Sequence, residues 1–221
     1  MKIGEAEAWL RQRLATLYGE GESFSMASIV MNYITGLSIG ERMAIKQDAL
    51  PERQLQQLNE VAGRLEQNEP VQYVLGECWF YGKRFFVDKT VLIPRSETEE
   101  LVDWVLKEVK DRNPGVFEKG PTDADETGCL KLLDIGTGSG CIALSLKNKM
   151  PKAEVWGCDV SEEALNVARR NGSELDIRVD FQGVNFLDEA QQKLLPTVDV
   201  IVSNPPYIPQ SGAAQMHANV L

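Results

Sequence analysis

Histidine is nearly absent from this chain of 221 residues, in which the only one is His217. Hydrolases of the Ser-His and Cys-His types need a histidine as general base, and histidine-rich metal sites need several. The four cysteines also lack the paired spacing of metal ligands. For Cys141 and Cys158, which lie in apolar segments, buried inert thiols are the better interpretation. We therefore expect no bound metal and no histidine-activated nucleophile.

Long apolar runs and an excess of positive charge are also missing. No stretch of about 18 apolar residues occurs, which predicts that no segment spans a membrane. The N-terminal residues 1–7 lack the apolar core of a signal peptide, so we expect a cytoplasmic protein without a membrane partner. The formal net charge of −10 disfavours a general nucleic-acid-binding surface.

A short apolar segment that runs into three glycines is the first motif with chemical content. Residues 130–140 read Leu-Lys-Leu-Leu-Asp-Ile-Gly-Thr-Gly-Ser-Gly, and an apolar helix is expected to follow. A dinucleotide fingerprint would place its third glycine three positions after the second, where this chain has Cys141. The spacing therefore disfavours a nicotinamide or flavin cofactor.

A second strand, predicted for residues 154–159, ends in Asp159, about 20 residues beyond the glycines. A carboxylate at that position can accept hydrogen bonds from both hydroxyls of a ribose. A nucleoside-containing ligand without a pyrophosphate fits this pattern, and S-adenosylmethionine is the natural candidate. An ordinary βαβ turn with a surface aspartate is the alternative.

The third motif, Asn204-Pro205-Pro206-Tyr207, follows the apolar run of residues 198–203. The two prolines stiffen the chain and have no N–H of their own, so the turn offers bare carbonyl oxygens. With the Asn204 carboxamide on one side and the Tyr207 ring on the other, such a turn can hold a planar amide or amine. A rigid connection without a ligand is the alternative.

The pattern of apolar residues predicts helices first and a mixed fold afterwards. Leucines recur at helical spacing at positions 10, 14 and 17, residues 27–33 form a second helical stretch that stops at Gly36, and a third stripe spans 55–65. Residues 78–81 and 84–87 read as a β-hairpin joined across Gly82-Lys83. Ser96 is a reasonable N-cap of the next helix, and Glu99 would complete a capping box.

The rest of the chain alternates strands with helices. Strands are predicted at 130–135, 154–159, 177–182 and 198–203, and helices at 139–149 and 161–171. This order is typical of an α/β fold with a parallel sheet that is covered on both faces. Ligands of such sheets bind at the carboxyl ends of the strands, which is where the glycines, Asp159 and Asn204 are expected.

With these residues, the chain resembles the HemK/PrmC family of protein-glutamine methyltransferases that modify peptide-chain release factors. The resemblance extends over essentially the whole chain and includes Glu-Pro-Val-Gln-Tyr-Val-Leu-Gly at 69–76 and Leu-Ile-Pro-Arg-Ser-Glu-Thr-Glu at 92–99. It implies a helical substrate-recognition domain at 1–68, a connector with the hairpin at 69–94, and a class I (Rossmann-like) methyltransferase domain at 95–221. It also implies that the substrate is the glutamine of a Gly-Gly-Gln loop, reached by a monomer without direct nucleic-acid contact.

The resemblance assigns roles residue by residue. The glycine segment would wrap the methionine part of S-adenosylmethionine, Asp159 would hold the ribose, and Asn185 and Phe186 would lie next to the adenine. The cofactor-binding set is then Gly136, Thr137, Gly138, Ser139, Gly140, Asp159, Asn185, Phe186 and Asn204. Asn204, Pro205 and Tyr207 would be catalytic, and Asn204, Pro205, Pro206 and Tyr207 would bind the substrate.

Three departures from the family pattern accompany these assignments. Asn185 stands where the family has an acid, and Ser96 where it usually has a proline. The family also implies a larger sheet than the four strands that this sequence supplies, so we expect a chain truncated at the C-terminus with an exposed edge on strand 198–203. An adenine-specific DNA methyltransferase, or a remnant that binds without catalysing transfer, are the alternative functions.

Overall fold

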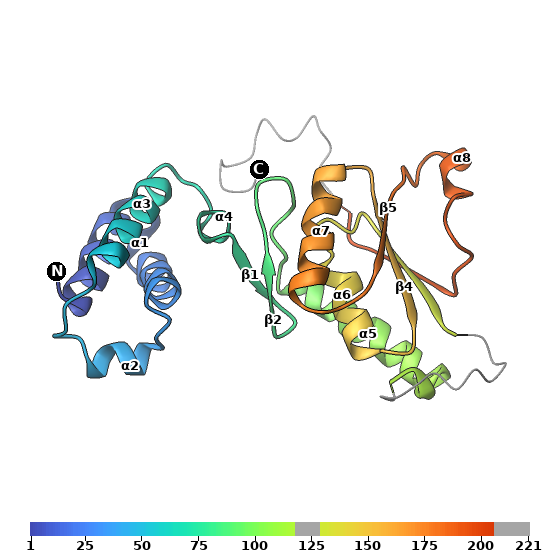
Figure 1. The fold of residues 1–221 in the computed structure, drawn as a ribbon, viewed down its shortest axis with the longest axis horizontal. Helices are drawn as coiled ribbons and strands as arrows, with labels where there is room; N and C mark the ends of the chain where they lie inside the picture. The colour runs from blue at the N-terminus through green and yellow to red at the C-terminus, as the bar shows by residue number, and fades with distance from the viewer. Residues whose placement is uncertain (118–128, 206–221) are drawn as a thin grey trace. The chain divides into compact units, whose positions relative to one another are not determined.

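The computed structural model describes residues 1–117 and 129–205, and their contacts divide the chain at Gly76 into two compact units. Residues 1–76 form the first unit, and the second begins at Glu77 (Figure 1). The short helix α4 (Val71–Leu75) belongs to the core of the first unit. The domain bounds that the family resemblance implies, at 68 and 94, remain a proposal.

The first unit consists of α1 (Ile3–Thr35), α2 (Ile39–Ala44), α3 (Glu52–Leu65) and α4. The two helical stretches predicted before residue 36 are halves of α1, which is interrupted at Gly19 (φ 75°, ψ 168°). As predicted, α1 ends at Gly36, which adopts the left-handed conformation that glycine tolerates best. Apolar residues of α1 and α3 that share one buried core include Leu10, Leu14, Val30, Leu58 and Leu65.

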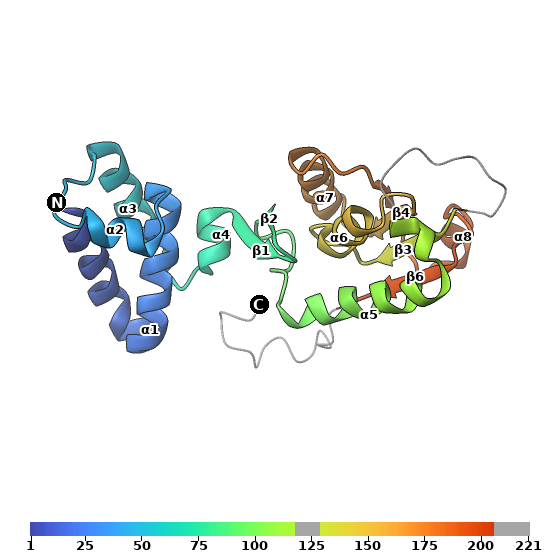
Figure 2. The same ribbon diagram turned by 90° about the horizontal axis from the view of Figure 1, so that it is seen from below.

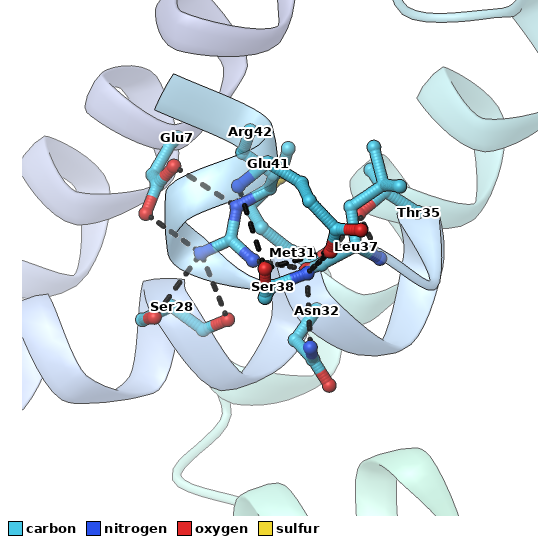
Figure 3. A network of polar contacts seen from close by, with 9 residues as sticks. All are labelled: Glu7, Ser28, Met31, Asn32, Thr35, Leu37, Ser38, Glu41 and Arg42. Atoms are coloured by element: carbon cyan, nitrogen blue, oxygen red, sulfur yellow. Dashed lines mark hydrogen bonds and ion pairs between the residues drawn. The ribbon is translucent and has the colours of Figure 1, made fainter. Parts of the chain in front are cut away.

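A buried arginine joins α1 to α2 within this unit (Figure 3). Arg42 is only 1% exposed. Its guanidinium forms an ion pair with Glu7, in which Nη2 lies 3.2 Å from Oε1. It also donates to the Leu37 carbonyl at 2.7 Å and to the Ser28 hydroxyl at 3.1 Å. A buried guanidinium is tolerated only when its donors find acceptors, and this network supplies them.

The second unit begins with a hairpin of β1 (Glu77–Phe80) and β2 (Lys83–Phe86). Phe80 pairs with Lys83, so the turn consists of Tyr81 and Gly82, one position earlier than the sequence predicted. Both turn residues have positive φ (49° and 73°), which matches the right-handed twist of the strands. Phe80 and Phe85 anchor the hairpin in the core of this unit.

Four parallel strands form the main sheet in the order β5-β4-β3-β6. Figure 2 labels β4, β3 and β6 of this sheet, and Figure 1 labels β4 and β5. Their bounds are β3 (Lys131–Ile135), β4 (Glu154–Asp159), β5 (Asp180–Gly183) and β6 (Val200–Ser203). The predicted strand 177–182 starts late, because the Ile177 N–H bonds back to the Gly172 carbonyl and closes the preceding helix. The observed sheet confirms the predicted α/β class.

Three helices, α5 (Glu97–Arg112), α6 (Cys141–Lys149) and α7 (Glu162–Glu174), pack on one face of this sheet. The expectation of a sheet covered on both faces is confirmed for the described part of the chain, although the three longer helices share one face. Segment 184–198, with the short α8 (Glu189–Gln192), covers Leu133 and Cys158 on the opposite face. A 3₁₀ turn, η1 (Pro114–Phe117), follows α5.

Strand β6 lies at the margin of the sheet. In the described ranges it pairs with β3 alone, and Ile201 is 56% exposed. A groove of about 340 Å³ between α5 and β6 is lined by Trp104, Val105 and Ile201 among others. The apolar edge expected from the sequence is thus present in the described structure. A search of the same ranges finds no helix long and apolar enough to span a membrane.

Candidate active site at the carboxyl ends of the strands

Strand order and register bring the three sequence motifs together at one edge of the sheet. Ile135, the last residue of β3, is opposite Cys158 of β4 on one side and Ser203 of β6 on the other. These three residues are followed in the chain by Gly136, Asp159 and Asn204, respectively. The glycine segment thus lies between the carboxylate and the carboxamide, as a site at the ends of parallel strands requires.

The backbone of the glycine segment is held by β4. The N–H groups of Gly136 and Thr137 both donate to the Cys158 carbonyl, at 2.9 and 3.0 Å. Gly136, Gly138 and Gly140 all have positive φ (69°, 52° and 77°), which other residues adopt only with strain. At Gly140 a side chain would also come within 3.0 Å of the Phe181 ring.

Asp159 is fixed by the backbone on both sides. One carboxylate oxygen accepts the Gly138 N–H at 2.9 Å, and the other accepts the Ser161 N–H at 3.0 Å. Each carboxylate oxygen has a second lone pair, so the half-buried group keeps the capacity to accept hydroxyl donors. This geometry is compatible with the ribose contact that the sequence suggested.

Asp134, one residue before the end of β3, was not identified as a site residue by the sequence reasoning. Its side chain is 1% exposed, and Oδ2 accepts from the Thr137 hydroxyl at 2.7 Å and from the Ala143 N–H at 3.3 Å. Oδ1 finds no hydrogen-bond donor among the described residues. Burial raises the pKa of Asp134 to about 6. The sequence did contain a signal, because Asp134 lies inside an otherwise apolar strand. A buried acid without a full set of hydrogen-bond partners is unusual and indicates a functional residue.

Asn185 and Phe186 follow β5 at the same edge. Phe186 is half-buried against Leu133, Cys158 and Val184. Asn185 is exposed, and its side-chain oxygen accepts the Leu187 N–H at 3.0 Å in a local turn. Their predicted position next to an adenine stays a prediction.

The side chain of Asn204 is hydrogen-bonded to the first turn of α5. Its Nδ2 donates to the hydroxyl of Thr98 at 2.9 Å, and the neighbouring Ser203 hydroxyl donates to the Ile135 carbonyl at 2.8 Å. Pro205 follows, with its side chain exposed. The predicted site residues Pro206 and Tyr207 lie outside the described residues.

The capping box predicted for Ser96 and Glu99 is wrong. Ser96 already has helical dihedrals (φ −57°, ψ −36°), and its hydroxyl makes no capping hydrogen bond. Glu99 instead accepts the backbone N–H of Tyr81, in the hairpin turn, at 2.9 Å. A tertiary hydrogen bond has replaced the local one, and it ties the start of α5 to the hairpin.

Comparisons with known proteins show the family of the chain. Residues 5–76 match the family model of the PrmC N-terminal domain, and residues 122–220 match that of the methyltransferase small domain. The chain is 39% identical to the release factor glutamine methyltransferase of Bacteroides thetaiotaomicron over 97% of its own length and 70% of the relative. The corresponding enzyme of Flavobacterium psychrophilum is 37% identical over 95% of this chain and 69% of the relative.

The parallel sheet, the glycine segment and the carboxylate at the end of β4 define a Rossmann-like methyltransferase domain. The identity to the curated relatives, which extends over most of the chain, shows which methyltransferase family the chain belongs to. The chain belongs to the release factor glutamine methyltransferase family.

Proposed function

We propose that this protein transfers a methyl group from S-adenosylmethionine to the side-chain amide nitrogen of the glutamine in the Gly-Gly-Gln loop of peptide-chain release factors. The observation that carries the proposal is the pairing of β3 with both β4 and β6, which places Asn204 beside the glycine segment. The curated relatives are named release factor glutamine methyltransferases, which supports the same substrate.

The residues present fit S-adenosylmethionine. A side-chain atom added at Gly136 or Gly138 would meet nothing within 4 Å, so the segment faces open space that a ligand can fill. We assign the methionine part of the cofactor to segment 136–140, the ribose hydroxyls to Asp159, and the adenine to Asn185 and Phe186. The buried, unpaired Oδ1 of Asp134 beside this segment is an acceptor that suits a cationic or N–H-bearing ligand.

The bound cofactor supplies a sulfonium methyl group, and the protein must present a nitrogen to it. An amide nitrogen is a weak nucleophile because its lone pair is delocalised into the carbonyl. In our proposal the Asn204 side-chain oxygen and the Pro205 carbonyl accept its two N–H donors, and Tyr207 packs on the amide plane beside Pro206. These contacts orient the nitrogen, and orientation alone can supply much of a rate acceleration.

The alternative function, methylation of the exocyclic amine of adenine in DNA, would use the same turn on a flipped base. A net charge of −10 disfavours it, because DNA binding depends on neutralising phosphates with Lys and Arg. We further propose that the enzyme acts as a monomer, which light scattering of the purified protein tests.

The deciding experiment incubates the protein with methyl-labelled S-adenosylmethionine and a purified release factor, either wild type or with the Gly-Gly-Gln glutamine replaced by alanine. Label on the wild-type factor alone is the expected result. Asn204→Ala should lower kcat by about 100-fold, because it removes positioning at the reacting nitrogen. Cofactor binding without any transfer would show a non-catalytic protein instead.

A further inference from the structure

Thr98 lies in the first turn of α5 and contacts the carboxamide of Asn204, which is 106 residues away in the sequence. The Thr98 residue is 8% exposed, so its hydroxyl is largely shielded from water. The hydroxyl oxygen accepts the Asn204 Nδ2 hydrogen at 2.9 Å.

The position of the Thr98 hydroxyl is set by the backbone around it. The Thr98 N–H donates to the Arg95 carbonyl at 3.0 Å, which fixes the start of the helix. The hairpin holds the same segment at two further points: the Cys78 thiol reaches the Pro94 carbonyl at 3.5 Å, and Glu99 accepts the Tyr81 N–H. Because Thr is β-branched, its χ1 is restricted to two main rotamers in a helix, which limits the positions that its oxygen can take.

A carboxamide has an oxygen end and a nitrogen end of nearly the same shape, and only the oxygen end can accept a hydrogen bond. The proposed reaction needs an acceptor toward the substrate –NH₂ group. If the Asn204 carboxamide rotated by about 180°, its own NH₂ group would face the substrate –NH₂ group. Both groups are donors, so no hydrogen bond would hold the substrate nitrogen. The residue that engages Nδ2 therefore decides which end is presented.

We propose that Thr98 is a positioning residue, which holds the Asn204 carboxamide by its nitrogen so that its oxygen is oriented to accept from the substrate amide. This inference rests on the proposed function and adds a residue to it. Thr98 acts through Asn204 and touches neither the transferred methyl group nor the reacting nitrogen.

Thr98→Val removes the hydroxyl at nearly constant volume and tests the proposal. We expect kcat for release-factor methylation to fall about tenfold, equivalent to about 1.4 kcal/mol, with the cofactor dissociation constant unchanged. Thr98→Ser keeps the acceptor and should restore most of kcat. Ser96→Ala is the matched control, since it removes a hydroxyl two residues away that caps nothing and should leave kcat at the wild-type value.

A double-mutant cycle separates positioning from simple stability. If Thr98 acts through Asn204, Thr98→Val should have no further effect on the residual rate in an Asn204→Ala background. Full additivity of the two losses, or a Thr98→Val variant that loses cofactor affinity while keeping kcat, would overturn the inference.

Nuclear magnetic resonance of the side-chain amides gives a readout that needs no turnover. The Asn204 Nδ2 hydrogens, assigned with Asn204→Asp, should exchange with water faster in Thr98→Val than in the wild type. Equal exchange rates would show that the bond does not hold the carboxamide. If the wild-type protein fails to label the release factor, the proposed function and this inference fall together, whereas labelling with an unaffected Thr98→Val variant removes the inference alone.

Discussion

Replacing Asn171 of α7 by alanine should loosen the hairpin and the glycine segment at the same time. Asn171 is 1% exposed and lies between these two parts of the second unit. Its side-chain oxygen accepts the Phe86 N–H at 2.7 Å, and its Nδ2 donates to the Phe86 carbonyl at 3.0 Å and to the Ser139 carbonyl at 2.9 Å. One carboxamide therefore satisfies three backbone groups, two in β2 and one in the glycine segment.

The expected loss of stability follows from these contacts. A buried hydrogen bond contributes about 1 kcal/mol net, and a buried backbone group left without a partner costs at least as much. Three bonds then give a decrease of about 3 kcal/mol in the free energy of unfolding, a large share of what holds a domain of this size together. Cofactor binding should weaken as well, because Ser139 belongs to the segment that we assign to the methionine part.

Urea unfolding measures this loss. Tryptophans 79, 104 and 156 lie in the second unit, so a Trp9→Phe background makes the fluorescence report on that unit alone. Asn166→Ala is the matched control, because Asn166 is exposed on the same helix and should cost less than about 0.5 kcal/mol. If Asn171→Ala is no more destabilising than Asn166→Ala, the three-bond account of this residue is wrong.

Three further predictions concern the buried arginine, the buried aspartate and the glycine segment. Arg42→Ala should destabilise the first unit by about 3–5 kcal/mol, since Glu7 and the Leu37 carbonyl lose their partner; the far-UV melting curve checks this. Burial raises the folded-state pKa of Asp134 to about 6, so the folded state binds more protons than the unfolded state, and Asp134 stabilises the fold less as the pH rises from about 4 to 6. Relative to Asp134→Asn, the wild type should therefore lose stability across that interval, and a constant difference between the two unfolding free energies would contradict the raised pKa. Gly140→Ala should cost about 1–2 kcal/mol in backbone strain alone, with weaker cofactor binding in an equilibrium titration, and wild-type affinity would count against our placement of the cofactor.

Local patterns in the sequence were enough to locate most elements. The apolar stripe of residues 55–65 became α3, and the glycine at position 36 ended α1. All four predicted strands exist, the one at 154–159 with the predicted bounds and the other three with altered bounds. The glycine segment, Asp159 and Asn204 were all expected at strand ends and are found there. These successes share a cause, since periodicity, glycine conformation and motif spacing are properties of neighbouring residues.

The errors of the sequence reasoning came from contacts between distant residues. The capping box at Ser96 was wrong because Glu99 bonds to the hairpin turn, 18 residues away. The strand–helix alternation predicted a sheet covered on both faces, and it did not indicate that α5, α6 and α7 would share one of them. A local pattern indicates which hydrogen bonds between neighbouring residues are possible. It does not indicate whether tertiary packing brings a competing partner closer.

The sequence by itself therefore determined the class of fold and the family, and it predicted residues that would hold a nucleoside and an amide. Only the tertiary structure decided that β3 lies between β4 and β6, which makes the glycine segment, Asp159 and Asn204 neighbours. It also revealed Asp134, Thr98 and Asn171, whose significance lies in burial and in partners up to 106 residues away. The physical reason is that burial and hydrogen-bond pairing are properties of the packed chain, so a threonine in a helix looks the same in sequence whether or not its hydroxyl bonds to a distant carboxamide.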